Sequence, residues 1–153
     1  MRVDYAFVAE AADSQAGLFY VTRGGTDIYA LPADFPRPLH LGGLSFVVRL
    51  AGDLEDIGQA RSVRFVIVDA DGHPLGFDQQ AEVRFERHPI DATLSSANMM
   101  AFRFYGFPVP DFGAYGFEVH AGDERLARVP FWVVAAESMN APDDPSEKPG
   151  GYL

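Results

Sequence analysis

The chain has 153 residues, a length that corresponds to a single domain, and it contains no cysteine, so disulfides, thiolate catalysis and cysteine-ligated zinc are excluded. Its 12 basic and 22 acidic side chains give a formal net charge of −10. Nucleic acid and anionic membrane surfaces are therefore not expected as partners, because the net field repels phosphate groups.

Short segments in which apolar and polar residues alternate recur along the chain, separated by glycines and prolines, and this period of two is typical of β-strands. The predicted strands cover residues 5–10, 18–23, 44–51, 62–69, 77–87, 99–105, 115–120 and 125–135. The first two flank a turn at residues 15–17 and are expected to form a hairpin. Residues 24–41 contain three prolines and are expected to be an irregular connection, since proline cannot donate to a sheet ladder. Residues 53–59 are expected to be a loop with at most one helical turn.

Because no crossover helix separates these strands, the predicted fold class is all-β, an antiparallel β-sandwich of about eight strands. The segment from Asp111 to Phe117 specifies this further. In immunoglobulin-like Greek-key sandwiches, a tyrosine two residues before a core position of strand F bonds back to upstream backbone. Tyr115 and Phe117 have this spacing, which predicts strand F at residues 115–120. The alternative is an ordinary core tyrosine in a hairpin.

Two acidic loops are candidates for calcium binding. One contains Asp53, Glu55 and Asp56, and the other contains Asp69 and Asp71. The second loop does not fit an EF-hand, because its glycine falls at the fourth position rather than the sixth. A calcium site at one end of the sandwich would require the two loops to converge. The alternative is that the second loop is a tight Asp-Gly turn, which tolerates positive φ.

A cluster of aromatic residues follows the sixth predicted strand. Alternation leaves Tyr105, Phe107 and Phe112 without an assigned inward position, around Pro108 and Pro110. These three rings are a candidate surface for a protein partner or for stacking on a sugar. The alternative is that they plug the end of the sandwich.

The sequence contains no recognisable catalytic motif. It has no Gly-x-Ser-x-Gly motif, and its glycine-rich residues 23–26 follow a strand without opening a helix. The four histidines are His40, His73, His88 and His120. No two lie three to five residues apart, so no helical zinc pair is predicted. Alternation places His120 beside Glu118 on an outward face, as a surface histidine. The chain is therefore predicted not to be an enzyme and to hold no cofactor or metal.

The composition changes near residue 137. Residues 1–136 carry the strand pattern and are predicted to form the β-sandwich domain. Residues 137–153 are polar, acidic and rich in proline and glycine, and they are predicted to be a flexible tail. The first 14 residues lack the basic start and the unbroken apolar run of a secretory signal, so the expected location is the cytoplasm.

Several short motifs occur in a fixed order along residues 3–135. They are Asp4-Tyr5-Ala6, Gly17-Leu18, Gly24-Gly25, Phe35-Pro36-x-Pro38, Arg49-Leu50, Asp71-Gly72, Phe107-Pro108, Gly113-x-Tyr115-x-Phe117-x-Val119 and Val129-Pro130-Phe131. Their order and spacing resemble a family of small bacterial and phage-associated proteins known only as a domain of unknown function. The resemblance implies a compact sandwich without an agreed activity, and it carries no catalytic residue over to this chain.

Taken together, these features predict a non-catalytic binding or assembly module that acts through a protein partner or through self-association. The alternative function is a calcium- or carbohydrate-binding sandwich that uses its end loops, either the two acidic loops or the aromatic segment around Tyr105 and Phe112.

Overall fold

The structure is a computed structural model, and it describes residues 1–139 of the chain. These residues form β1 (Arg2–Gln15), β2 (Leu18–Gly24), β3 (Ile28–Leu31), β4 (Leu39–Leu41), β5 (Leu44–Ala51), the 3-10 turn η1 (Leu54–Asp56), β6 (Ala60–Val68), β7 (Pro74–Arg84), β8 (Ala97–Phe104), β9 (Phe107–Val109), β10 (Gly113–Ala121), β11 (Glu124–Ala135) and α1 (Ala136–Met139). The predicted all-β class is confirmed, and so is the single turn expected at residues 53–59.

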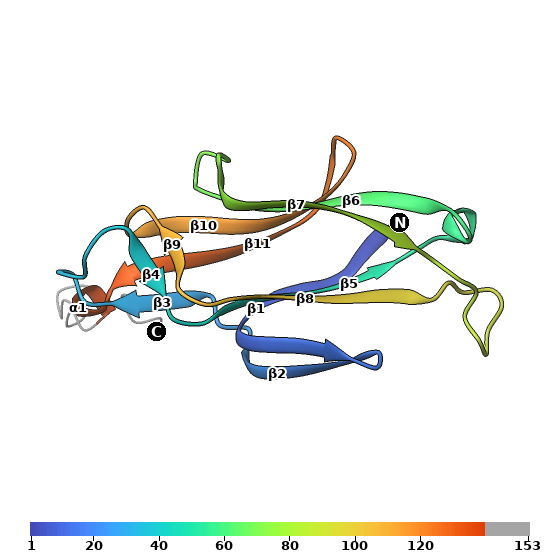
Figure 1. The fold of residues 1–153 in the computed structure, drawn as a ribbon, viewed down its shortest axis with the longest axis horizontal. Helices are drawn as coiled ribbons and strands as arrows, with labels where there is room; N and C mark the ends of the chain where they lie inside the picture. Colours follow the sequence, from blue (N-terminus) through green and yellow to red (C-terminus); the bar gives the residue numbers. More distant parts are fainter. Residues whose placement is uncertain (140–153) are drawn as a thin grey trace, which may run out of the picture.

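Two sheets lie face to face and form the body of the molecule (Figure 1). A four-stranded sheet has the order β2-β1-β5-β8, and a five-stranded sheet has the order β3-β11-β10-β6-β7. Their ladders are antiparallel, except that β3 runs parallel to β11 at one edge. A separate ladder of β4 with β9 lies at the end of the molecule that also carries α1 (Figure 1). The predicted sandwich-like packing of sheets is therefore present.

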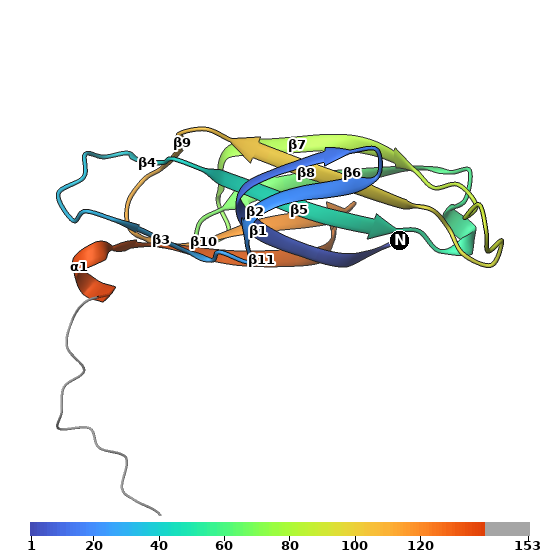
Figure 2. The same cartoon turned by 90° about the horizontal axis from the view of Figure 1, so that it is seen from below.

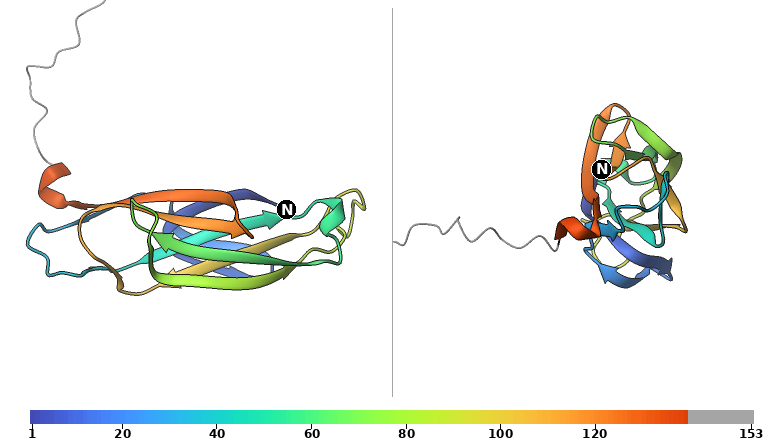
Figure 3. Two further views of the ribbon diagram at one scale, coloured as in Figure 1. Left: turned by 90° about the horizontal axis from the view of Figure 1, so that it is seen from above. Right: turned by 90° about the vertical axis from the view of Figure 1, so that its left-hand side faces the viewer.

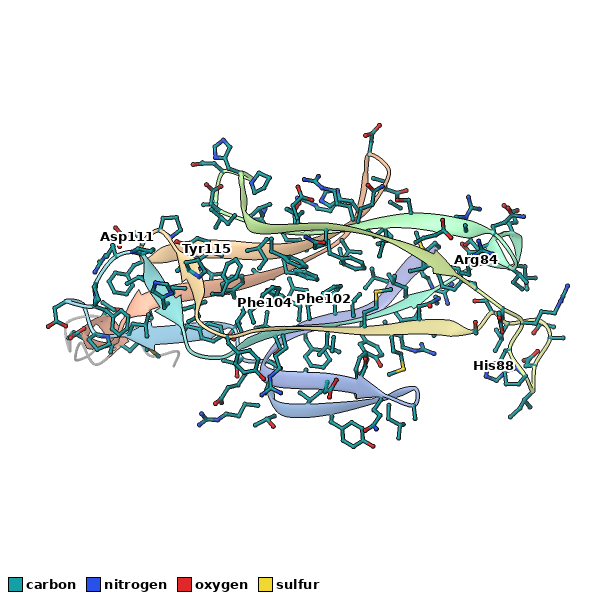
Figure 4. The ribbon with its side chains drawn as sticks, viewed as in Figure 1. Arg84, His88, Phe102, Phe104, Asp111 and Tyr115 are labelled. Atoms are coloured by element: carbon teal, nitrogen blue, oxygen red, sulfur yellow. The ribbon has the colours of Figure 1, made fainter. Side chains whose placement is uncertain are left out.

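Phenylalanine rings from both sheets fill the space between them. Phe46 of β5 stacks on Phe117 of β10 with ring centroids 4.0 Å apart, and Phe65 of β6 lies 4.7 Å from Phe102 of β8. Figure 4 shows Phe102 and Phe104 directed into this space. Each buried ring contributes about 1.5–3 kcal/mol through the hydrophobic effect, so this stack is the main link between the sheets.

The prediction that residues 24–41 form an irregular connection is wrong for two short stretches, which form the strands β3 and β4. Neither stretch is a central strand. β3 pairs at the edge of the five-stranded sheet, and β4 pairs only with β9. The three prolines of this segment, Pro32, Pro36 and Pro38, lie just outside these strands, so none of them takes a position in β3 or β4. The eight predicted strands correspond to β1, β2, β5–β8, β10 and β11, and the three short strands β3, β4 and β9 were not predicted.

Strand β1 takes part in two ladders, and this creates a third layer. Residues 2–9 pair with β5, whereas residues 9–15 pair with β2. The second half of β1 and all of β2 form a two-stranded ribbon that crosses over β5 and β8 on the outer face of the four-stranded sheet (Figures 2 and 3). The small side chains of Ala9 and Ala12 allow close packing on Val47. The hairpin predicted from the sequence is thus confirmed.

The first residues of the predicted tail continue directly from β11. They form the single helical turn α1, and the Glu137 carboxylate accepts a hydrogen bond of 3.2 Å from the Ala33 backbone N–H. Residues 140–153 of the predicted tail lie outside the described residues. In the part of the chain that the structure describes, no helix has the length and apolar character needed to cross a membrane.

Candidate functional site

A buried carboxylate lies at the centre of the outer face of the five-stranded sheet. Glu118 of β10 points away from the phenylalanine core, yet only 7% of its surface is exposed. One carboxylate oxygen lies 2.8 Å from Nε2 of His120, and the other accepts a hydrogen bond of 2.9 Å from Arg125. The guanidinium of Arg128 lies 3.4 Å from the same oxygen. One carboxylate therefore organises three cationic or ionisable side chains.

A β-bulge brings both arginines to this carboxylate. Arg125 and Arg128 are three residues apart in β11, so in a regular strand they would point to opposite faces. In the ladder with β10, Val119 pairs with Ala127 but His120 pairs with Arg125, which leaves Leu126 as the extra residue. The bulge redirects Arg125 to the outer face, an effect that such irregularities commonly have beside functional sites.

A glycine provides the space that Arg128 occupies. A Cβ atom at Gly116 would lie only 2.8 Å from Nε of Arg128, closer than a real contact permits. Glycine at this position lets the arginine lie across β10 and reach Glu118. Glycine matters here because it has no side chain, and not because of its backbone conformation.

A second ion pair lies beside the first. Arg64 of β6, which pairs with His120 in the ladder, makes two hydrogen bonds of 2.7 and 2.6 Å to the Asp78 carboxylate of β7. The hydrogen bond from Arg64 lowers the pKa of Asp78. Burial acts to raise the pKa of Glu118, but the hydrogen bonds from His120 and Arg125 outweigh it, so this pKa also lies below its ordinary value. Both carboxylates are charged at neutral pH, and the chemistry that they support is the positioning of arginines.

Apolar side chains continue the same face along β11 and β3. Pro130 and Trp132 alternate with buried core residues, and Trp132 pairs with Ile28 of β3. Trp132, the only tryptophan of the chain, is 39% exposed, and Ile28 is 45% exposed. We call the surface formed by Arg64, Arg125, Arg128, Pro130, Trp132 and Ile28 the arginine–tryptophan face. It combines fixed cationic groups with an exposed apolar region.

The three aromatic residues predicted as a partner surface differ in their exposure. Tyr105 is 73% exposed, with the Arg103 guanidinium 4.8 Å from its ring centre. Phe112 is half-buried beneath Arg37. Phe107 is only 6% exposed and packs against other core rings, so it plugs the end of the sandwich and cannot present its ring to a partner. Of the three, Tyr105 is the ring that is largely exposed.

The hydrogen bond predicted for Tyr115 is present. Its hydroxyl donates a hydrogen bond of 2.5 Å to the backbone carbonyl of Asp111, upstream of β10. The ring is 5% exposed and stacks on Phe131 of β11. Tyr115 and Asp111 lie together at the end of the sheet in Figure 4. The side chain therefore ties the β9–β10 connection to the core.

The two acidic loops do not converge, as the calcium alternative would require. They lie at opposite ends of β6, a strand of nine residues that spans about 30 Å (Figure 1). Asp53 and Asp56 bind the amino group of Met1 at 2.9 and 2.8 Å, and Asp56 also accepts a hydrogen bond from Arg61. These carboxylates already have cationic partners.

The other acidic loop holds three side chains with ligand atoms within 4.8 Å of one another, those of Asp69, Asp71 and His73. One oxygen of Asp69 accepts backbone hydrogen bonds from Asp71 and His73, which is the geometry of a turn stabilised by an aspartate side chain. Two carboxylates and an imidazole also differ from the all-oxygen coordination that calcium prefers. The turn interpretation of this loop accounts for these contacts.

Sequence reasoning found part of the site and missed the rest. It placed Glu118 and His120 on an outward face, as the structure does. It did not find Arg125 and Arg128, because their odd spacing in a regular strand excludes a common face. No glycine or proline marks the bulge at Leu126. The available signal was indirect: an outward carboxylate on one strand and two arginines just after the following tight turn.

Comparison with protein families identifies the family to which most of the chain corresponds. The model of a family of unknown function (DUF6941) matches residues 4–134. A search of the curated proteins found no match. The matched region agrees with the span of the motifs identified in the sequence, and it includes every residue of the arginine–tryptophan face.

Proposed function

The chain belongs to this family of unknown function (DUF6941), and from that premise we propose that it is a non-catalytic binding module with an immunoglobulin-like Greek-key fold. Its partner is a protein that docks on the arginine–tryptophan face. A bacterial or phage-associated origin belongs to the same proposal, and it rests on the order of the sequence motifs alone.

The strand order supports the immunoglobulin-like part of the proposal. With β10 as strand F, β1, β5 and β8 take the positions of strands A, B and E in one sheet. In the other sheet, β11, β10, β6 and β7 take those of G, F, C and C′. The hydrogen bond of Tyr115 to upstream backbone agrees with this assignment, because a tyrosine corner lies at the start of strand F.

The binding proposal rests on one observation: Trp132 and Arg128 lie on the same outward face of β11. Tryptophan and arginine are, with tyrosine, the residues most enriched among those that dominate protein–protein binding energy. Glu118 holds Arg128 and Arg125 in fixed positions, so a partner that binds them loses less side-chain entropy. On this face, the arginines Arg64, Arg125 and Arg128 outnumber the carboxylates of Glu118 and Asp78, although the net charge of the whole chain is −10. The face therefore favours a partner with an acidic surface around an apolar centre.

The test compares partner capture by three variants. Trp132→Thr removes the exposed ring but keeps a residue suited to a strand, and Arg128→Ala removes one guanidinium. Tyr105→Ser is the matched control, because it removes another exposed aromatic ring from a different part of the molecule. Circular dichroism first establishes that each variant is folded.

Proteins retained from a lysate by the unmodified chain are then quantified by mass spectrometry. We expect at least one to be retained equally by Tyr105→Ser and at least tenfold less by both other variants. Retention unchanged by Trp132→Thr and Arg128→Ala would overturn the proposal. Loss caused only by Tyr105→Ser would instead assign binding to the aromatic loop.

A second candidate function is ion or carbohydrate binding by an end loop. The observation in its favour is the grouping of Asp69, Asp71 and His73 in one turn. It has less support than the first, because backbone groups already bind Asp69 and the acidic loop with Asp53 and Asp56 lies at the other end of β6. A melting experiment with calcium, described in the Discussion, separates the two candidates.

A further inference from the structure

We propose that two copies of this chain associate by antiparallel pairing of their β2 strands, which extends the four-stranded sheet across a twofold axis. This inference concerns a surface separate from the arginine–tryptophan face, so it goes beyond the function proposed above. It follows from the sheet edge that, among the described residues, combines a length of seven residues, no proline and several exposed apolar side chains.

Strand β2 is the outermost strand of its sheet and pairs only with β1 among the described residues. Six of its seven residues are exposed, and Phe19 is half-buried. Leu18 and Tyr20 are 59% and 58% exposed and lie on the same side of the strand. Unpaired backbone groups beside exposed apolar side chains form a template on which another strand can add.

The other sheet edges differ from β2 in ways that hinder pairing. β7 begins with a proline and carries Asp78, Glu82 and Arg84. β3 has only four residues, and β8 exposes no large apolar side chain on which a second strand could pack, whereas β2 exposes Leu18, Tyr20 and Val21. Short length, proline and charge are the usual means by which proteins block edge pairing. β2 has none of them along its length, since its single charged residue, Arg23, is next to its end.

Contacts with the sheet below hold the ribbon in place, and they hold the edge of β2 with it. The backbone N–H of Ala12 in β1 donates a hydrogen bond of 3.1 Å to the Ser45 hydroxyl of β5, and this contact is buried. Phe19 packs with Ala9, Ala12 and Val47, which seats the ribbon on the sheet below. A two-stranded hairpin alone is marginally stable, but one packed in this way presents a fixed edge.

A second copy of the chain fits this edge by its charge distribution. Antiparallel pairing of β2 with itself puts the two Arg23 side chains at opposite ends of the new ladder, so like charges do not face each other. Across the ribbon, Glu10 binds Arg23 at 3.1 Å and Asp13 is the only other charged residue. The ribbon thus carries a charge of −1, whereas the chain carries −10. Two acidic molecules meet there with little local repulsion, and the contact is isologous, as in most homodimers.

The first measurement is the mass in solution, by light scattering or sedimentation, over a range of concentrations. We expect the unmodified chain to reach twice its mass of 16.7 kDa. Tyr20→Lys is expected to give monomers, because it places two lysines near the twofold axis. Tyr105→Lys, a matched change at another exposed tyrosine, and Trp132→Thr are expected to remain dimeric. A monomer at every concentration for the unmodified chain would overturn the proposal, and so would a dimer that Tyr20→Lys leaves intact.

The second measurement locates the contact and does not depend on a disruptive variant. Because the chain has no cysteine, single cysteines can be introduced one at a time over residues 18–23, with Tyr105→Cys as control. We expect mild oxidation to yield a disulfide-linked dimer most efficiently at one or two neighbouring positions, those nearest the twofold axis. Dimers that form with no positional preference, or as readily with Tyr105→Cys, would contradict pairing through β2. Failure of partner capture at the arginine–tryptophan face would leave this result unaffected.

Discussion

At the scale of single residues, Tyr115 shows how one hydroxyl group fixes a connection. We expect Tyr115→Phe to lower the free energy of unfolding by about 1–3 kcal/mol, because the stack on Phe131 is kept while the hydrogen bond to the Asp111 carbonyl is lost. Urea unfolding measures the change. Tyr105→Phe is the control, since Tyr105 lies on the surface with 73% exposure. Equal stability of the Tyr115→Phe variant and the unmodified chain would show that the corner bond has no energetic role.

Ala16 occupies a backbone conformation that alanine rarely adopts. In the turn between β1 and β2, Ala16 and Gly17 have φ values of 51° and 74°, and a two-residue hairpin turn with both φ positive favours Asn-Gly. We expect Ala16→Asn to raise the free energy of unfolding by up to about 1 kcal/mol, since asparagine tolerates the left-handed region. Thermal melting checks this. Ser14→Asn, in the adjoining strand, should bring no such gain, and a gain of the same size there would contradict the explanation.

At the scale of elements, the contact between β10 and β11 makes stability depend on pH through Glu118. The pKa of this carboxyl group is lowered in the folded state from an ordinary value of 4.5. The charged form therefore stabilises the fold fully above that value, and this contribution is lost as the pH falls below it. We expect Glu118→Gln to cost about 1–3 kcal/mol at neutral pH, with the difference from the unmodified chain shrinking under acid conditions.

The measurement is urea unfolding at a series of pH values from neutral to acidic. Glu82→Gln serves as the control, because Glu82 is an exposed carboxylate paired with the exposed Arg84 at 3.3 Å. A Glu118→Gln deficit that stays constant with pH would show that shape, and not charge, accounts for the effect.

The same elements show what the sequence could and could not predict. Long alternating strands were predicted because each buries a regular face, as with Phe46, Val48 and Leu50 of β5. The short strands β3, β4 and β9 were not, since three or four residues carry too little alternation to detect and owe their pairing to distant partners. The site was only half visible for a related reason. Its carboxylate follows the alternation of β10, but Arg125 reaches it through a bulge that depends on how two strands pair.

At the scale of the whole molecule, the separation of the acidic loops determines the expected response to calcium. A ligand that binds only the folded state at 100 times its dissociation constant adds about 2.7 kcal/mol to stability. Because the loops lie at opposite ends of β6, we expect the melting temperature to stay unchanged in millimolar calcium. Magnesium at equal concentration controls for ionic strength. A rise specific to calcium and abolished by Asp71→Asn would favour the end-loop function over the proposed binding module.

The double pairing of β1 has a consequence for how the molecule opens. The amide protons of its first half that bond to β5 lie within the body of the sandwich, and we expect them to exchange with solvent only when the whole fold opens. Those from residue 10 onward belong to the ribbon, and we expect rare local openings of its contacts with Val47 and Ser45 that leave the phenylalanine stack intact. Hydrogen exchange is therefore expected to change from global to local control within one continuous strand, so that β1 records two different stabilities along its length.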